Sequence, residues 1–331
     1  MTTTDTQIVK LFDPQIERLP DFYPWAQVFI EAMQDGFWTA KKFTFDSDVV
    51  DFKLNLSEKE RLVVTRVLAA IAQIEVAVKE FWKRLGDHLP HPSIKDLGIT
   101  MAYVETIHNN AYEKLLKKLG LIDVFRENMH VPALAGRVAY LNKHAERVYP
   151  NDQRKQYIYS LILFTLFVEN VSLFSQFYVI LWLNRTKNVL KDASQQVKYT
   201  RNEELLHGQA GSKIINTLRE QYPDLFDDEL MARVKEECEV TYDAECNLID
   251  WMLDGYEADG LSADILKGYV RERLNESLEG IGYAPTFDVT PEQQKQTFWM
   301  TEGLLAPARV DFFNSEPTSY THADAAEDDD F

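Results

Sequence analysis

Cysteine is scarce in this chain, which has only Cys238 and Cys246 among its 331 residues. The two stand eight positions apart within a helical pattern, too far along one helix to form a disulfide. No Cys-x-x-Cys pair or zinc-ligand spacing occurs in the sequence. We therefore expect two reduced thiols in a cytoplasmic protein. The polar first ten residues, which lack the apolar core of a signal peptide, agree with that expectation.

Glycine and proline are also few, at 13 and 12 residues, and long stretches contain neither. This scarcity argues against many short strands joined by turns. No sustained alternation of apolar and polar residues, the pattern of a half-buried strand, appears anywhere. The sequence therefore predicts an all-α protein.

The apolar periodicity and the capping signals give the expected helices. Ser57-x-x-Glu60 has the form of a capping box at a helix start, and Gly86 is the expected stop of that helix. The predicted helices cover residues 22–37, 57–82, 93–120, 133–148, 152–186, 191–221, 227–257 and 263–279.

Basic residues are fewer than acidic ones, with 35 lysines and arginines against 53 aspartates and glutamates, and the formal net charge is −18. Such an excess of acid disfavours nonspecific binding to nucleic acid. Part of it lies at the C-terminus, where residues 314–331 are small, polar and acidic. A segment of this composition cannot bury enough apolar surface to order itself. We expect a helical domain over residues 1–313 and a flexible acidic tail over 314–331.

One long apolar run, residues 157–183, is nearly long enough to span a bilayer. Glu169 and Asn170 stand at its middle, and a carboxylate at a bilayer centre costs about 2.5–3.5 kcal/mol on insertion scales. We therefore predict a helix at the centre of the bundle and no membrane segment.

Two helices each carry a Glu-x-x-His motif, Glu105-Thr-Ile-His108 and Glu204-Leu-Leu-His207. Residues three apart share a helix face, so each motif directs a carboxylate and an imidazole the same way. Two further helices each place one glutamate among apolar residues. The full set of candidate metal ligands, in chain order, is Glu75, Glu105, His108, Glu169, Glu204 and His207.

This order is the one that a dinuclear metal site in a four-helix bundle requires. Each piece alone has an ordinary explanation, since a single Glu-x-x-His is common and Glu75 could pair with Lys79 one turn later. Glu169 is harder to dismiss, because a lone carboxylate in an apolar helix is costly. We predict a ferritin-like helical bundle with two metal ions between four core helices. Carboxylates with two imidazoles suit iron or manganese.

The motifs resemble those of the small subunit of class I ribonucleotide reductase, and the likeness covers nearly the whole chain. Tyr112 follows His108 by four residues, as in that family, where this tyrosine can carry a radical. Its alternative role is that of a core tyrosine with a hydrogen-bonded hydroxyl. The second motif matches as well, except that Glu203 stands where the family usually has aspartate.

The resemblance implies a route for oxidising equivalents between the metals and a large catalytic subunit. Trp38, in Gly36-Phe37-Trp38, resembles the near-surface tryptophan of that route, with a helix-end packing role as the alternative. Tyr320 resembles the tail tyrosine that bridges to the large subunit, and Phe331 would anchor the tail there. Together with Glu203 these residues would relay oxidation to a cysteine of the large subunit, from a small subunit that forms a homodimer.

The metal is expected to be a manganese pair. Glu75 stands where the family often has aspartate, and Lys79 would lie on the same helix face as Glu75. This combination resembles class Id, whose dimanganese cofactor is activated by superoxide, an anion that an ammonium group would attract. Two iron ions, a manganese–iron pair, or a site with a Tyr112 radical remain alternatives, and Lys79 could instead extend to solvent.

Two other protein classes use similar ligands. A stand-alone ferritin-like dimetal oxidase has the same order of glutamates and histidines but needs neither Trp38 nor Tyr320. A metal-storage cage is built from much shorter subunits. The sequence therefore favours the reductase small subunit, with the oxidase as the alternative.

Overall fold

The computed structural model describes residues 8–128 and 130–302, and for residues 75–77 and 302 it describes the backbone alone. Within these ranges the chain is helical, with no strand beyond one isolated bridge between Ala258 and Leu261. The all-α prediction is confirmed. The first half comprises α1 (Trp25–Asp35), η1 (Ala40–Lys42), α2 (Asp46–Val50), η2 (Asp51–Asn55), α3 (Glu58–Lys83), α4 (Leu85–His88), α5 (Pro92–Leu119), α6 (Ile122–Asn128) and α7 (Pro132–Leu141).

The second half comprises η3 (Asn142–Ala145), α8 (Gln153–Leu163), η4 (Phe164–Glu169), α9 (Phe174–Lys187), α10 (Lys191–Gln221), η5 (Pro223–Leu225), α11 (Asp228–Leu253), α12 (Ala263–Gly280), α13 (Pro291–Thr297) and α14 (Trp299–Glu302). Of the η elements, η2 and η4 are π-helices and the others are 3₁₀-helices.

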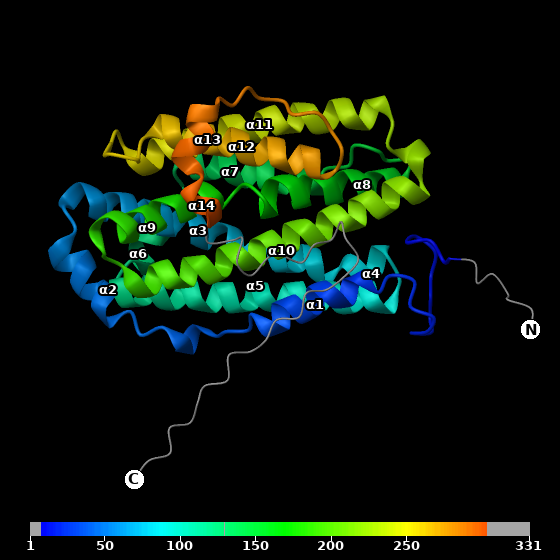
Figure 1. The fold of residues 1–331 in the computed structure, drawn as a ribbon, viewed down its shortest axis with the longest axis horizontal. Coiled ribbons are helices and arrows are strands. Elements are labelled where there is room, and N and C mark those ends of the chain that lie inside the picture. Colours follow the sequence, from blue (N-terminus) through cyan, green and yellow to red (C-terminus); the bar gives the residue numbers. More distant parts are fainter. Residues whose placement is uncertain (1–7, 129, 303–331) are drawn as a thin grey trace, which may run out of the picture.

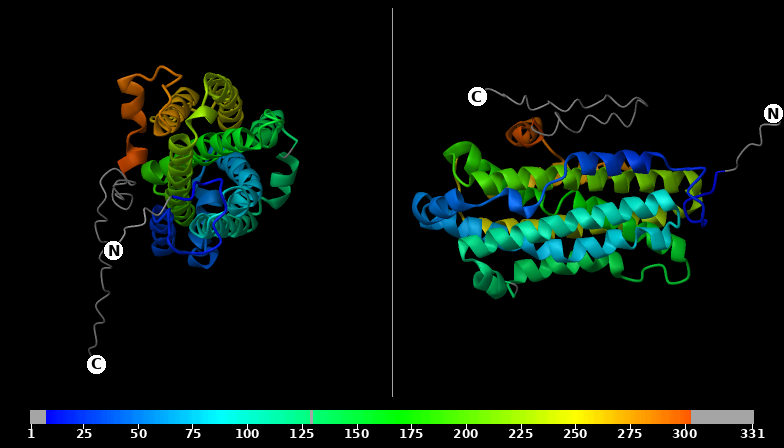
Figure 2. Two further views of the ribbon diagram at one scale, coloured as in Figure 1. Left: turned by 90° about the vertical axis from the view of Figure 1, so that its right-hand side faces the viewer. Right: turned by 90° about the horizontal axis from the view of Figure 1, so that it is seen from below.

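The long helices form an elongated bundle. In Figure 1, α5 and α10 run side by side with α1 against both, and α3 lies along α5 behind them. On the other side α11 pairs with α12 and α7, and α13 lies against α12. Helices α3, α10, α11 and α12 pack against the α8–η4–α9 segment, and Figure 2 shows the bundle end-on and from below. The bundle thus places one apolar segment at its centre and the long amphipathic helices around it.

The central segment is the apolar run that the sequence singled out. The stretch Gln153–Lys187 is long and apolar enough to cross a membrane, but 89% of its most apolar window is buried inside the protein. The protein interior therefore accounts for its hydrophobicity, as predicted for a core helix.

This segment differs from the prediction in one respect. A continuous helix over 152–186 was expected, whereas α8 gives way to the π-helix η4, residues 170–173 form turns, and α9 begins at Phe174. In the wider turn the Ser172 backbone N–H donates to the Phe167 carbonyl, five residues back. A uniformly apolar sequence has no periodicity from which such a break could be located, and π-turns often occur at functional sites.

Helix ends followed the capping signals in part. Ser57 and Glu60 form the predicted capping box. Gly86, however, is not the stop: α3 ends at Lys83, and Gly86 lies inside α4. A Cβ at Gly86 would lie 2.8 Å from the Cβ of Lys95, so the glycine allows α4 to approach α5 closely. Helix α5 begins at Pro92, because proline is favoured at a first helical position.

The remaining expectations differ mainly by short elements. The helix over 191–221 has the predicted bounds, whereas the one over 133–148 ends at Leu141 and continues as η3. The short helices α2, α4, α6, α13 and α14 were not predicted, because a segment of one or two turns shows too little periodicity.

Candidate metal centre

Three elements bring five of the six predicted ligands to the bundle interior. Glu105 and His108 come from α5, and Glu204 and His207 come from α10. Glu169 is the last residue of η4. All five side chains are at most 2% exposed to solvent. Glu75, the sixth, belongs to the backbone of α3, and its side chain lies outside the described residues.

The five side chains converge. Glu105, Glu169, Glu204 and His207 each offer one ligand atom such that all four atoms lie within 4.8 Å of one another. His108 adjoins this group, with its Nδ1 3.3 Å from Glu105 Oε2 and 3.2 Å from Glu204 Oε1. We call these five residues the carboxylate cluster.

The atoms of the cluster that face one another are short of hydrogen bonds. Among the described residues, both oxygens of Glu105, Oε2 of Glu169 and both ring nitrogens of His207 have no hydrogen-bond partner. Yet Glu105 Oε1 lies only 2.8 Å from His207 Nδ1. Buried carboxylates without partners are costly, and a cation among them removes the cost. This donor set therefore fits metal ions, and its oxygen-rich character with two imidazoles suits manganese or iron.

The charges of the cluster are unbalanced. Burial opposes the imidazolium form, but the nearby carboxylates outweigh it and raise the pKa of both His108 and His207. Burial, together with the charges of Glu105 and Glu169, raises the pKa of Glu204. Without metal ions, the raised pKa values of these groups favour bound protons, which offset part of the negative charge. A pair of cations would do the same without them.

A hydrogen-bonded line leads away from the cluster. His108 Nε2 lies 2.7 Å from Glu203 Oε2, and the same oxygen accepts a hydrogen bond of 2.8 Å from Trp38 Nε1. Glu203 thus joins Trp38 to the imidazole whose other nitrogen faces the carboxylates. The structure joins these three residues by hydrogen bonds through one carboxylate oxygen of Glu203, and a relay of oxidation through them stays a prediction.

Trp38 is more deeply buried than a near-surface tryptophan, at 3% exposed. Tyr199, which is partly buried, covers it, with the two rings stacked at a centroid distance of 5.7 Å. The hydroxyl of Tyr199 accepts a hydrogen bond from the Lys42 ammonium at 2.6 Å. No sequence motif marks Tyr199, although it lies on the same helix one turn before Glu203.

Tyr112 and Lys79 occupy different environments. Tyr112 is buried one turn beyond His108, and its hydroxyl donates to Thr200 Oγ1 at 3.4 Å. Lys79 is partly exposed and has no hydrogen-bond or ion-pair partner in the described part of the chain. Tyr320 and Phe331, and with them the division of the chain at residue 313, lie outside the described residues.

Two contacts of the η4 region were also missed. Trp82 Nε1 donates to Glu169 Oε1 at 2.7 Å. Beyond Glu169, Asn170 lies so close to Gly208 that a Cβ there would be 2.0 Å from Asn170 Oδ1. Signals for both existed: Trp82 follows Glu75 by two helical turns on one face, and Gly208 directly follows His207.

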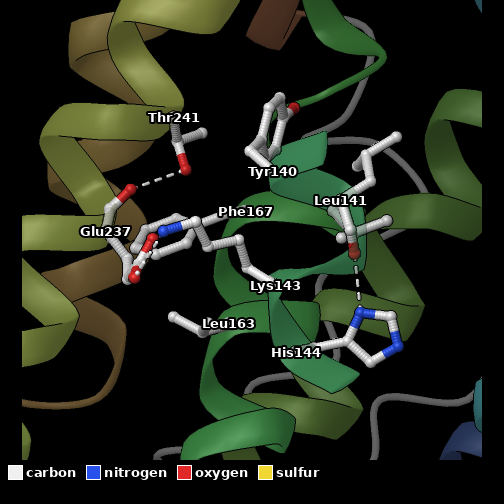
Figure 3. A pocket seen from close by; sticks show the side chains of 9 residues that line it. Tyr140, Leu141, Lys143, His144, Leu163, Phe167, Glu237 and Thr241 are labelled. Atoms are coloured by element: carbon white, nitrogen blue, oxygen red, sulfur yellow. Dashed lines mark hydrogen bonds and ion pairs between the residues drawn. The ribbon is translucent and has the colours of Figure 1, made fainter. Parts of the chain in front are cut away.

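A small cavity nearby is not part of the centre. It lies between η3, the second half of η4 and α11, and is lined by Tyr140, Lys143, His144, Phe167 and Glu237 among others (Figure 3). Its polar groups already have partners, since Lys143 pairs with Glu237 at 3.1 Å and His144 Nδ1 donates to the Leu141 carbonyl. No residue of the carboxylate cluster lines it.

Comparison with known proteins agrees with the geometry. The family model of ribonucleotide reductase, small chain, matches residues 17–296. The probable ribonucleoside-diphosphate reductase small subunit of Invertebrate iridescent virus 3 is 25% identical over 330 residues, which cover 95% of this chain and 86% of that protein.

Two solved structures have the same fold. The R2 subunit of ribonucleotide reductase from Clostridium botulinum has a TM-score of 0.77 at 18% identity and covers 85% of this chain and 88% of its own. The dimanganese(II)-NrdF of Streptococcus sanguinis has a TM-score of 0.69 at 17% identity, over 84% of this chain and 95% of its own. At such identities the likeness concerns the fold alone. With the family model matched over most of its length, the chain belongs to the ribonucleotide reductase small-chain family.

Proposed function

We propose that this chain is the small subunit of a class I ribonucleoside-diphosphate reductase, which stores one oxidising equivalent and passes it to a large catalytic subunit. The observation that carries the proposal is that one ligand atom from each of three buried glutamates and from His207 lies within 4.8 Å of the others. Among the described residues, both oxygens of Glu105 and Oε2 of Glu169 have no hydrogen-bond partner. Membership of the small-chain family supports the same role.

In this proposal the carboxylate cluster, together with Glu75, holds two metal ions. Bound redox-active metals supply the oxidising equivalent after contact with an oxygen species. The protein fixes the ligands on four elements, α3, α5, η4 and α10, and keeps water away. Leu173 and Phe177, both at most 2% exposed, lie beyond Glu169 and help to close the site.

The route out of the centre runs through His108, Glu203 and Trp38. One oxygen of Glu203, Oε2, contacts both His108 Nε2 and Trp38 Nε1. A proton on either of these nitrogens can therefore shift toward Glu203 as an electron moves between Trp38 and the metal centre. Tyr320 would continue the route to a cysteine of the large subunit, and Phe331 would anchor the tail. A series of redox-active side chains is needed because the distance is too long for one electron-transfer step.

We propose two manganese ions as the preferred metals, as in class Id, with two iron ions or a manganese–iron pair as alternatives. The dimanganese state of the Streptococcus sanguinis neighbour belongs to that protein and supports the choice by analogy of fold. Lys79 would act near the centre, and Tyr112 would serve as a neighbouring tyrosine without a radical. Low-temperature EPR of protein activated with each metal tests this, since an organic radical on Tyr112 would exclude class Id.

Deletion of residues 315–331 tests the reductase role. Without Tyr320 and Phe331, a small subunit loses activity with its large subunit but keeps its metal content and its helical circular dichroism. A single Tyr320→Phe change removes the redox-active hydroxyl and keeps the anchor, so it should abolish turnover while the two subunits still bind each other.

The contrasting result favours the alternative. Unchanged oxidation chemistry after the deletion, with no dependence on a large subunit, would indicate a stand-alone ferritin-like dimetal oxidase. A soluble, cytoplasmic homodimer is part of the reductase proposal, and sedimentation of the metal-loaded protein measures its size.

A further inference from the structure

The two oxygens of Glu169 have different environments. Oε1 accepts a 2.7 Å hydrogen bond from Trp82 Nε1 in the protein interior. Oε2 lies 3.3 Å from His207 Nδ1 and has no hydrogen-bond partner among the described residues. One oxygen is therefore tied to the protein, and the other faces the carboxylate cluster.

Glu169 needs such a tether because its own backbone is irregular. It is the last residue of the π-helix η4, and turns follow at residues 170–173. A carboxylate at the end of a π-helix is not aimed by regular helix geometry as Glu105 and Glu204 are. Its direction has to be set by a contact from another element.

Trp82 is well placed to set that direction. It is 0% exposed and lies in the last turn of α3. Its ring meets Phe164 edge-on at 5.4 Å and lies 6.4 Å from the ring of His207. Its backbone is held as well, because a Cβ on Gly98 of α5 would lie 2.6 Å from the Trp82 carbonyl oxygen. The indole N–H is thus a donor in a fixed position.

We infer that Trp82 is a positioning residue of the metal centre, which holds Glu169 so that only Oε2 is offered to a metal ion. The inference rests on the proposed metal centre and adds to it a residue that is not a ligand. Loss of the N–H frees Oε1 and lets the carboxylate rotate. Residues that orient a ligand in this way typically change metal affinity by about 10–100-fold when they are replaced.

The test compares Trp82→Phe with Trp182→Phe in the full-length chain. Trp182 is also buried, and its indole donates to a backbone carbonyl, that of Asp259, at 3.0 Å. Both changes remove one buried indole donor, but only the first touches a cluster residue. Metal-free protein is titrated with Mn²⁺, and the EPR signal of free aqueous Mn²⁺ gives stoichiometry and affinity without any activity measurement.

We expect Trp82→Phe to weaken binding of at least one of two manganese ions by about 10–100-fold. The Trp182→Phe protein should bind manganese like the wild type, although both variants unfold at a lower temperature. Equal manganese binding by all three proteins would overturn the inference and leave Trp82 a packing residue. If the wild-type protein bound no manganese, that result would contradict the proposed metal centre itself, and it is distinguishable from equal binding by all three proteins.

A second variant separates the N–H from the ring. Replacement of Trp82 by 3-benzothienylalanine keeps the shape of the side chain but puts sulfur in place of the N–H. This variant should fold even where phenylalanine leaves a cavity. It should show the same loss of manganese affinity, and wild-type affinity here would contradict the role of the N–H.

Discussion

At the scale of single residues, burial alone does not distinguish a metal ligand from a structural acid. Glu245 is as deeply buried as Glu105. However, Glu245 Oε1 accepts a 2.6 Å hydrogen bond from Tyr140 and lies 3.3 Å from Arg137 Nε. Neither oxygen of Glu105 has a hydrogen-bond partner in the described part of the chain. Glu245 Oε2 also lacks a hydrogen-bond partner, but the buried Arg137 offsets the charge of this carboxylate. In the described part of the chain Glu105 pairs with histidines alone. A buried group of carboxylates with no arginine or lysine beside it, rather than burial, indicates a metal cation.

The glutamates of the cluster repel one another when no metal is bound. We predict that Glu204→Gln lowers manganese affinity by at least about tenfold and yet stabilises the metal-free protein. Burial and the charges of Glu105 and Glu169 disfavour the Glu204 carboxylate, as its raised pKa indicates, and glutamine removes that charge. The melting temperature of metal-free protein should rise by roughly 2 °C or more.

The matched control is Glu245→Gln, a change of the same kind at a buried acid outside the cluster. It should leave manganese binding unchanged and lower the melting temperature, because it removes the negative charge that pairs with the buried Arg137. Differential scanning calorimetry and a manganese titration distinguish the two variants. A metal-free Glu204→Gln protein less stable than the wild type would contradict the repulsion argument.

At the scale of elements, the centre depends on how closely η4 approaches α10. Two glycines of α10 make that approach possible. A Cβ on Gly208 would lie 2.0 Å from Asn170 Oδ1, and a Cβ on Gly211 would lie 2.4 Å from Thr165 Oγ1. Real Cβ atoms do not come so close, so a larger residue at either position displaces the side chain of Asn170, which follows Glu169, or of Thr165, which lies within η4.

We predict that Gly208→Ala destabilises the protein by about 1–3 kcal/mol, the usual cost of overpacking a core, and also weakens manganese binding. Gly136→Ala is the control, since a Cβ there meets nothing within 4 Å and Gly136 lies within α7. Alanine should stabilise that helix by about 0.4–1 kcal/mol. Urea unfolding measures the change in stability of both variants. Equal changes at the two positions would contradict the close approach of Asn170 to Gly208.

Helix positions could be predicted where local signals exist. The capping box at Ser57 and the bounds Lys191–Gln221 follow from residues a few positions apart. The π-helix Phe164–Glu169 could not be predicted, because all the residues around it are buried and no polar face marks the break. Its geometry depends on Asn170 and Thr165 lying against α10.

At the scale of the whole molecule, one buried polar network connects the outer helices to the bundle. Arg137 of α7, fully buried, pairs with Glu245 of α11. It also donates to the Ala70 carbonyl of α3 at 3.0 Å and to Gln176 Oε1 of α9 at 2.9 Å. One guanidinium thus links four helices.

We predict that Glu245→Ala destabilises the protein by about 3–5 kcal/mol, because Arg137 is left as a buried charge without an anion. The surface pair of Glu113 and Lys117 is the control, and Glu113→Ala should change stability by about 0–1 kcal/mol. Chemical denaturation of both variants measures the change in the free energy of unfolding. A change at Glu245 as small as that at Glu113 would contradict the prediction and mean that water reaches Arg137.

The sequence by itself determined the helical class and the residue types, order and spacing of the candidate ligands. These features are local, because helical periodicity brings residues three or four apart to one face. The tertiary structure decided which partners meet across the bundle. Trp82 reaches Glu169 over 87 positions, and Trp38 reaches Glu203 over 165. Such contacts depend on how whole helices pack, and no local pattern in the chain encodes which atoms they bring together.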